Sequence, residues 1–167
     1  YASEVTGTFP VDGRFSHVLP PGLYAYWLDH KDVRIEVADA SQVRFTHAEL
    51  PVILRSALAE RALESVVVEA GHEGVLLVDG RIADVLDAGQ YAFWKNVARV
   101  SVRTVDLRET VLDVGGQDIM TADKVTLRLN AVVTYKIMDA RKAVSQTDDV
   151  RQALYRETQL VLRGVIG

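Results

Sequence analysis

The chain contains an internal repeat. Residues 11–27, VDGRFSHVLPPGLYAYW, return 67 positions later as residues 78–94, VDGRIADVLDAGQYAFW, and ten of the seventeen aligned positions are identical. In the first copy the identical residues are Val11, Asp12, Gly13, Arg14, Val18, Leu19, Gly22, Tyr24, Ala25 and Trp27. A duplicated structural unit keeps turn formers and large apolar residues of this kind, whereas a duplicated active site would keep acids, bases or nucleophiles. The repeat therefore predicts two copies of one scaffold.

Each copy has the pattern of a β-meander. Asp12-Gly13 and Asp79-Gly80 are tight-turn dipeptides whose glycine tolerates a positive φ, and the flanking Val, Leu, Tyr and Trp residues suit half-buried strands. An alternating run follows each copy and extends the repeat: residues 33–37 up to Asp39, and residues 100–105 up to Asp106. We expect residues 1–45 to form an N-terminal β-meander unit.

Residues 46–68, between the copies, show helical periodicity. Their apolar residues recur at spacings of three and four: Leu50, Ile53, Leu54, Ala57 and Leu58. Thr46 and Glu49 match a capping box, but Pro51 would then remove an early helical hydrogen bond, so a start just before Pro51 is the alternative. We predict a linking helix over this segment.

Residues 69–167 are predicted to form a second, larger domain. Along the segment from Val125 to Ile137 the odd-numbered residues are apolar and the even-numbered residues are polar, except for Val132. This alternation indicates an antiparallel sheet with one solvated face. Helical periodicity begins at Asp139, breaks near residues 145–147 and resumes in an amphipathic helix that reaches the end of the sequence. We expect the domain to be truncated in this C-terminal helix.

Composition excludes several classes of function. The net charge of −4 comes from interspersed acidic and basic residues, and no Lys/Arg cluster could follow the phosphates of a nucleic acid. The absence of cysteine excludes disulfides, thiolate catalysis and Cys-based metal sites. No apolar stretch approaches the roughly 18 to 20 residues of a membrane span. We expect this fragment itself to be soluble, with any anchor in a segment outside it.

The residues with catalytic or ligating potential do not form a known motif. His17, His30, His47 and His72 have no partner at the spacing of a zinc site, so we expect no metal and no cofactor. The pairs Ser16-His17 and Asp29-His30 contain triad residue types without a nucleophile elbow, and we assign no catalytic residue. Gly115-Gly116 lacks the rest of a phosphate-binding loop and is interpreted as a strand-connecting turn.

The aromatic residues of the repeat have two interpretations. They could form an exposed platform for a carbohydrate or a lipid headgroup, or they could pack in the core. Aromatic residues that alternate on short strands usually point one ring inward, so we favour the core. The residues concerned are Tyr24, Tyr26 and Trp27 in the first copy and Tyr91, Phe93 and Trp94 in the second.

A stripe on the last helix is the candidate oligomer interface. It consists of Val150, Leu154, Glu157 and Val161. These side chains could cover the domain's own sheet, or they could begin a coiled coil between protomers. Glu157 is the distinguishing residue, because a carboxylate within the stripe is costly to bury unless a cation meets it.

Residues 73–167 resemble the stomatin/slipin branch of the band 7 superfamily, also called SPFH or prohibitin-homology domains. The resemblance depends on six pieces in the right order: Gly74-Val75 before VDG, the Gly-x-Tyr-x-x-Trp element of residues 89–94, residues 117–125 (QDIMTADKV), residues 130–139 (NAVVTYKIMD), Ala143 and residues 162–167 (LRGVIG). Ala140 stands where the family often has proline, and Ala122 where lysine is common. The N-terminal copy has no counterpart in the common short stomatins.

The resemblance implies an α+β fold in which an antiparallel sheet is flanked by helices. Here that domain would be preceded by the repeated β-meander unit and the linking helix. It further implies a non-enzymatic scaffold at the cell membrane, in a prokaryote, which forms homo-oligomers and organises or regulates membrane proteins. A membrane-bound serine protease is a frequent companion of such proteins.

Two other classes of function stay open at this point. The duplicated meanders could enclose a cleft and act as a β-rich ligand-binding module. The chain could also be a hydrolase that uses His17 or His30, or a regulatory subunit of a membrane protease. A pocket in which histidines and carboxylates cluster would favour the enzyme, and an enclosed apolar cavity between the repeats would favour the module.

Overall fold

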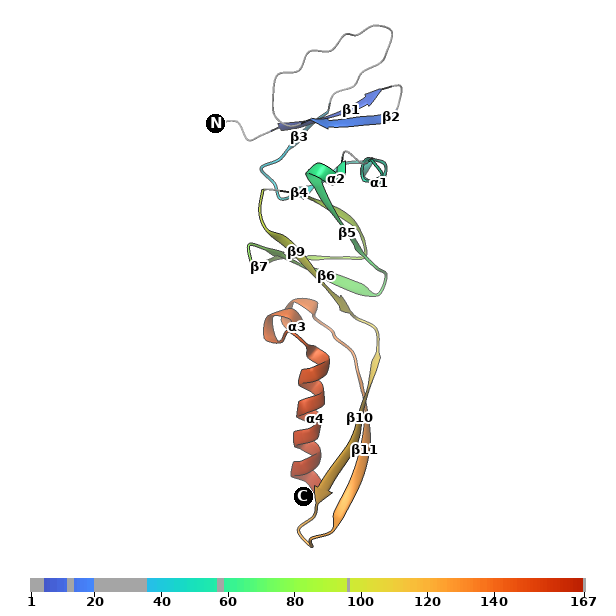
Figure 1. The fold of residues 1–167 in the computed structure, drawn as a ribbon, viewed down its shortest axis with the longest axis vertical. Helices are drawn as coiled ribbons and strands as arrows, with labels where there is room; N and C mark the ends of the chain where they lie inside the picture. The colour runs from blue at the N-terminus through green and yellow to red at the C-terminus, as the bar shows by residue number, and fades with distance from the viewer. Residues whose placement is uncertain (1–4, 12–13, 20–35, 57–58, 96, 167) are drawn as a thin grey trace.

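The computed structural model describes residues 5–11, 14–19, 36–56, 59–95 and 97–166. They form a long, narrow molecule in which small sheets stack along the axis and a helix lies beside a hairpin at the C-terminal end (Figure 1). The sheets have the strand orders β2-β1-β3, β4-β8-β5, β7-β6-β9 and β10-β11, and every pairing is antiparallel. This mixture of antiparallel sheets and helices confirms the predicted α+β class.

The internal repeat appears in the backbone as two sheets with the same pairing. The first consists of β1 (Val5–Val11), β2 (Arg14–Leu19) and β3 (Glu36–Asp39), and the second of β6 (His72–Val78), β7 (Arg81–Leu86) and β9 (Val100–Asp106). Gly7 lies opposite Leu19 in the first sheet, as Gly74 lies opposite Leu86 in the second. Both hairpins also shift register at the same place, after Phe9 and after Leu76. The duplicated sequence therefore encodes a duplicated hairpin with one register.

The turn predicted for the second copy is present. Asp79 and Gly80 join β6 to β7 with φ values of 50° and 78°, the left-handed pair that a two-residue hairpin loop requires. Its counterpart in the first copy, Asp12-Gly13, lies outside the described residues.

The predicted meander is wrong at its third strand. Strand β8 (Gly89–Trp94) follows β7 directly but pairs with β5 (Leu63–Val68) on one side and β4 (Arg44–Phe45) on the other. The reason is burial, since three successive residues, Ala92, Phe93 and Trp94, are buried and β8 needs cover on both faces. Leu76 and Leu86 of the second sheet cover one face of β8, and Ile53 and Ala59 of the α1–α2 segment cover the other. The corresponding strand of the first copy, through Trp27, lies outside the described residues.

The single helix predicted for residues 46–68 is also wrong. The segment contains two short helices, α1 (Leu50–Ile53) and α2 (Ala59–Ala62), and then strand β5. Helix α1 starts just before Pro51, as the alternative proposed, with Glu49 at the N-cap position. The run Val66-Val67-Val68 favours a strand, because β-branched side chains lose little freedom on a pleated surface.

Two hydrophobic clusters of the described core lie on the two faces of β8. Phe93 packs with Val68, Leu76 and Leu86 on one face of this strand. Ala92 and Trp94 belong to the cluster on the other face, together with Phe45, Ile53, Ala59 and Leu63. Trp94 meets Phe45 edge-to-face at 5.1 Å between ring centroids. The core interpretation thus holds for Phe93 and Trp94, while Tyr24, Tyr26 and Trp27 lie outside the described residues.

The C-terminal elements match the predicted pattern. Strands β10 (Thr110–Met120) and β11 (Thr126–Tyr135) form a long hairpin, which is followed by α3 (Ala140–Gln146) and α4 (Val150–Ile166). The Asp139 carboxylate accepts a hydrogen bond from the backbone N–H of Lys142 and caps α3. Ala140 and the second sheet's Val75 and Val105 pack in one cluster, which joins α3 to that sheet.

Gly115-Gly116 is a bulge inside β10 and not the strand-connecting turn that the sequence suggested. The register shifts between Val114 and Gln117, and Gly116 has φ 67°. The amide oxygen of Asn130 on β11 accepts the N–H of Gly116 at 2.8 Å. The two glycines therefore absorb an extra residue without ending the strand.

We predict that Gly74→Ala destabilises the chain by about 1 to 3 kcal/mol. A Cβ atom at this position of β6 would lie 2.9 Å from side-chain carbons of both Val68 and Val102. Chemical denaturation followed by circular dichroism measures the change. Gly89→Ala is the matched control in another strand, because its Cβ would meet nothing closer than 3.6 Å. Equal stability losses in the two variants would contradict this account of Gly74.

Candidate functional site

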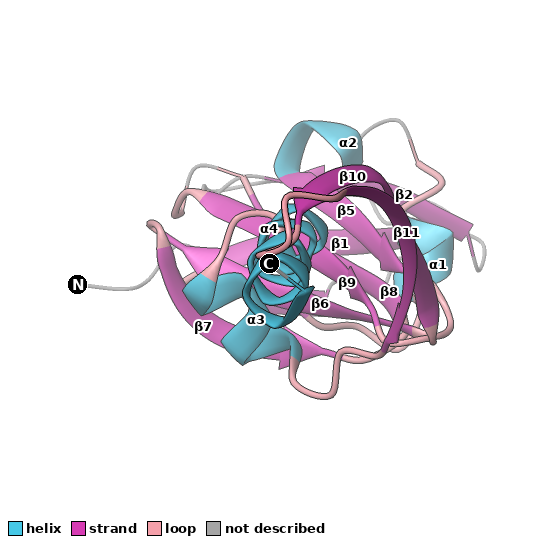
Figure 2. Ribbon diagram, turned by 90° about the horizontal axis from the view of Figure 1, so that it is seen from below, coloured by secondary structure: helices cyan, strands magenta, loops and turns pink. Residues whose placement is uncertain are grey.

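The last helix lies against one face of the β10–β11 hairpin. Figure 2 shows α4 beneath the arch of the two strands. On β10 the residues that point toward the helix are buried and alternate with exposed ones: Leu112, Val114, Gln117 and Ile119. None of the residues of α4 is buried, although the helix is strongly amphipathic. The helix therefore covers the hairpin without being covered itself.

The four residues of the predicted interface stripe differ in burial. Val150 and Leu154 are half-buried, while Glu157 and Val161 are exposed. The half-buried side of α4 passes through Tyr155, Thr158 and Leu162 and is thus rotated relative to the stripe. Glu157 lies in solvent and needs no buried cation.

Two solvent-facing surfaces flank this helix–hairpin pair. We define the helix outer face by Gln152, Arg156, Leu160 and Arg163, which are exposed on α4. We define the hairpin outer face by Val111, Asp113, Asp118, Arg128 and Val132, which are exposed on β10 and β11. Large apolar side chains are prominent on both: Leu160 is 61% exposed, Val111 53% and Val132 67%. Both faces thus set apolar side chains among charged ones.

The histidines with described side chains hold local structure. The Nδ1 atom of His47 accepts the backbone N–H of Glu49 at 3.0 Å, so the proton of the neutral ring lies on Nε2 and is donated to the Glu36 carboxylate at 2.6 Å. The ring also stacks on Phe45. This contact ties β3 of the first sheet to the loop before α1. His72 lies 3.8 Å from Asp106, and the side chains of His17 and His30 lie outside the described residues.

The Asp106 carboxylate closes the loop after β9 through three hydrogen bonds from Arg108. It accepts hydrogen bonds from the backbone N–H of Arg108 at 2.9 Å and from the Arg108 guanidinium at 2.7 and 2.8 Å. These contacts, the side-chain bond first, hold the pKa of Asp106 well below its usual range. Asp39 is its equivalent in the first copy and accepts the backbone N–H of Ser41 at 2.8 Å. The repeat thus includes the turn after each sheet.

Clefts occur at several places among the described residues. One, of about 530 Å³, lies between β3 and the segment before α1, where Glu36 and His47 already pair with each other. Another, of about 780 Å³, lies where β9, the base of the hairpin and the α3–α4 junction meet. Within the described part of the chain, no three histidine or carboxylate side chains gather closely enough to hold a metal ion.

The described residues define a mixed α+β domain. Small antiparallel sheets lead into a long hairpin backed by an exposed amphipathic helix, and the polar contacts of Asp106 and Asp139 serve a turn and a helix cap. Among the described residues no helix is long and apolar enough to cross a membrane.

Comparison with known proteins identifies the family. The model of the SPFH domain / Band 7 family matches residues 66–167. The chain is 30% identical over 100 residues to a band 7 family protein of Acanthamoeba polyphaga mimivirus, an alignment that covers 60% of this chain and 32% of that protein. It is 46% identical over 63 residues to a stomatin homolog of Pyrococcus horikoshii, covering 38% of this chain and 24% of the relative. The human stomatin-like protein 3 is 41% identical over 63 residues, covering 38% and 22%.

The chain therefore belongs to the SPFH domain / Band 7 family, as its motifs suggested. It spans less than a third of the length of these three relatives. Proteins of the family are membrane-associated, generally non-enzymatic scaffolds and typically oligomerise.

Sequence reasoning missed the two outer faces. It placed Val161 on a stripe that could cover the sheet or begin a coiled coil, yet Val161 is 60% exposed, and the neighbouring Leu160 is 61% exposed. One signal was available, since Val132 is the apolar residue that interrupts the polar face of its strand. The exposure of that residue shows that this solvent-facing side of the hairpin is not uniformly polar.

We predict that Arg108→Ala raises the pKa of Asp106 toward its ordinary value and leaves that of Asp39 unchanged. Because the pKa of Asp106 is lowered by folding, its contacts stabilise the chain above the unfolded-state pKa, and this contribution is lost as the pH falls through the folded-state pKa. Carboxyl NMR titration measures both groups. Ser41→Ala is the matched control and should raise the pKa of Asp39 alone, since the Ser41 side chain is the main cause of its lowering. An unchanged Asp106 titration in Arg108→Ala would refute the assignment.

Proposed function

We propose that this chain is part of a membrane-associated scaffold of the slipin/stomatin type. It assembles with copies of itself and organises or regulates membrane protein partners, and it carries no catalytic residues of its own. The observation that carries this proposal is the family membership of residues 66–167, together with the exposed apolar and charged faces of α4 and the hairpin.

The mechanism of such a scaffold is avidity. Copies tethered to one bilayer have a high effective concentration, so each contact needs little buried area. The exposed apolar residues of α4, among them Leu160 and Val161, suit weak contacts of this kind. Membrane attachment is assigned to a segment outside the sequence described here, and a membrane-bound serine protease is a partner that the scaffold would regulate.

We predict that the chain self-associates reversibly and that Leu160→Asp weakens this association at least tenfold, or about 1.4 kcal/mol. Leu160 is 61% exposed on α4, so a carboxylate there would be desolvated in an interface and harmless in solvent. Sedimentation velocity over a hundredfold concentration range measures the association.

Val67→Asp is the matched control, because Val67 is also 61% exposed but lies on β5. Thermal melting establishes that both variants fold. A chain that remains monomeric throughout the range would contradict the proposed self-association, and equal weakening by both variants would remove α4 from the contact.

A further inference from the structure

We propose that the free edge of strand β9 binds an extended, uncharged segment of a partner protein as an additional strand. The inference rests on the proposed scaffold function, because it names a kind of partner that the scaffold would hold. The site is the cleft of about 780 Å³ where β9, the base of the hairpin and the α3–α4 junction meet. Strand addition draws its affinity from main-chain hydrogen bonds and its specificity from every second side chain.

Strand β9 (Val100–Asp106) pairs with β6 on one side, in a register that has no bulge. Two backbone hydrogen bonds beyond its ends show which residues face β6. The N–H of Leu107 is donated to the carbonyl of Gly71. The carbonyl of Arg99 accepts the N–H of Asp79. Because backbone groups point alternately to the two edges of a strand, the odd-numbered residues of β9 face β6.

The even-numbered residues Val102 and Thr104 therefore direct their N–H and C=O groups to the free edge. Within the described part of the chain, no strand or loop pairs with them there. Five consecutive residues of β9, from Val102 to Asp106, line the cleft. Neighbouring residues of a strand have opposite faces, so this run means that the edge of β9 borders the cleft. An unpaired edge of this kind is a template for another strand.

A second wall of the cleft is apolar and incompletely covered. Ile137 follows the hairpin, Val144 lies on α3 and Val150 begins α4, and all three line the cleft and are half-buried. Ile137 and Val144 pack against the cluster that contains the buried Val105 of β9. Side chains on the same face of an added strand would continue this cluster, so every second residue of the occupant should be apolar.

The charges at the cleft balance one another, which favours an uncharged occupant. Arg103 on β9 donates a hydrogen bond to Asp148 at 2.9 Å, and Asp149 caps α4 by accepting the backbone N–H of Gln152. Together with the Asp106–Arg108 pair, the cleft and its rim carry three cations and three anions: Arg103, Arg108 and Arg151, and Asp106, Asp148 and Asp149. A segment of strong charge would gain nothing from this balance and would meet like charges.

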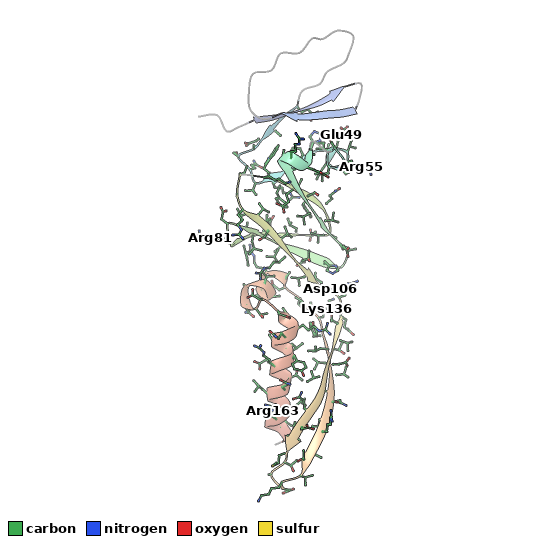
Figure 3. All side chains as sticks on the ribbon, in the orientation of Figure 1. Glu49, Arg55, Arg81, Asp106, Lys136 and Arg163 are labelled. Atoms are coloured by element: carbon green, nitrogen blue, oxygen red, sulfur yellow. The ribbon has the colours of Figure 1, made fainter. Side chains whose placement is uncertain are left out.

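The position of the cleft gives the occupant several elements to contact. Figure 3 shows Asp106, at the end of β9, close to Lys136, where the second sheet meets the base of the hairpin. Helix α3 lies beside the same junction (Figure 1). The rim is open to solvent, since the side chain of Asp148 is 93% exposed. A bound strand would therefore touch the sheet, α3 and the start of α4 together.

A model peptide tests the site. The probe is the heptapeptide Thr-Val-Thr-Val-Thr-Val-Thr, which is uncharged, alternates in polarity and reads the same in both directions, with fluorescein joined through a glycine linker. We expect saturable binding by fluorescence anisotropy. In NMR hydrogen exchange the peptide should protect the amides of Val102 and Thr104, while those of Arg103 and Val105 are already protected by β6 in the free chain.

Three control peptides separate strand addition from unspecific adhesion. The peptide Thr-Thr-Val-Val-Val-Thr-Thr has the same composition without the alternation, and the other two carry Glu or Lys in place of the central valine. We expect each to bind at least about tenfold more weakly than the probe.

A proline in β9 tests the edge directly. Thr104→Pro removes an N–H that faces the free edge and leaves the bonds to β6 intact, so it should weaken probe binding at least about tenfold. Thr104→Val is the matched control, because it keeps the N–H, and it should bind like the wild-type chain. Thermal melting establishes that both variants fold.

Backbone N-methylation of the probe gives a readout that leaves the protein unchanged. One peptide is methylated at its second, fourth and sixth residues, and the other at its third, fifth and seventh. Each blocks the N–H groups of one edge only, so one peptide should bind and the other should not. Binding of both, or of neither, would overturn strand addition.

The remaining outcomes are equally distinct. Absence of saturable probe binding, or equal binding of the non-alternating peptide, overturns the inference. Weaker self-association of Thr104→Pro would mean that another copy occupies the edge, which also overturns it. A chain that self-associates but does not bind the probe leaves the proposed scaffold standing without this site. A chain that binds the probe and stays monomeric supports the site and contradicts the proposed self-association.

Discussion

The burial of strand β8 on both faces is the constraint on which the rest of the structure depends. Phe93 is fully buried in one cluster, and Trp94 packs against Phe45 in another. Because one strand contributes to both clusters, the segment before the second repeat and the repeat itself share a single packing unit. Substitutions at these positions would therefore be felt on both sides of the sheet. The second sheet in turn supports α3 through Ala140, which positions the start of α4 beside the hairpin.

The buried residues that stabilise the fold and the exposed faces of α4 and the hairpin lie in different parts of the structure. The buried residues concentrate around β8 and the second sheet, whereas α4 has none and the hairpin is buried on one face only. A two-stranded hairpin is marginally stable alone, so the helix is required to cover its apolar face. The opposite faces of both elements are then available to other molecules without loss of that cover. The proposed scaffold function requires such a division, because its contacts must form and dissociate while each copy stays folded.

The sequence predicted elements well where one periodicity dominated. The alternation from Val125 to Ile137 and the restart of helical spacing after residue 147 both correspond to observed elements. Pairing could not be predicted, because β8 and β7 are adjacent in sequence and only tertiary burial moves β8 into another sheet. The prediction of a single helix over residues 46–68 was wrong for a related reason, since the helical spacing of this segment competes with the strand preference of three valines. The interface stripe stays a prediction, and its residues differ in burial because a helical pattern gives the apolar side of a helix and not the direction of the neighbouring strand.

The shared register of the two hairpins has a consequence for folding. Strands β1 and β6 have the same length, shift at the same place and offer equivalent pairing positions to β2 and β7. During folding, each hairpin strand thus has a near-copy elsewhere in the chain with which it can pair incorrectly, and adjacent similar units are prone to such exchange. The strands differ at Pro10, which occupies the position of Leu77 and has no N–H to donate. The described strands of the two units otherwise pair in the same order, so sequence differences between the copies are what can keep each strand with its own partner.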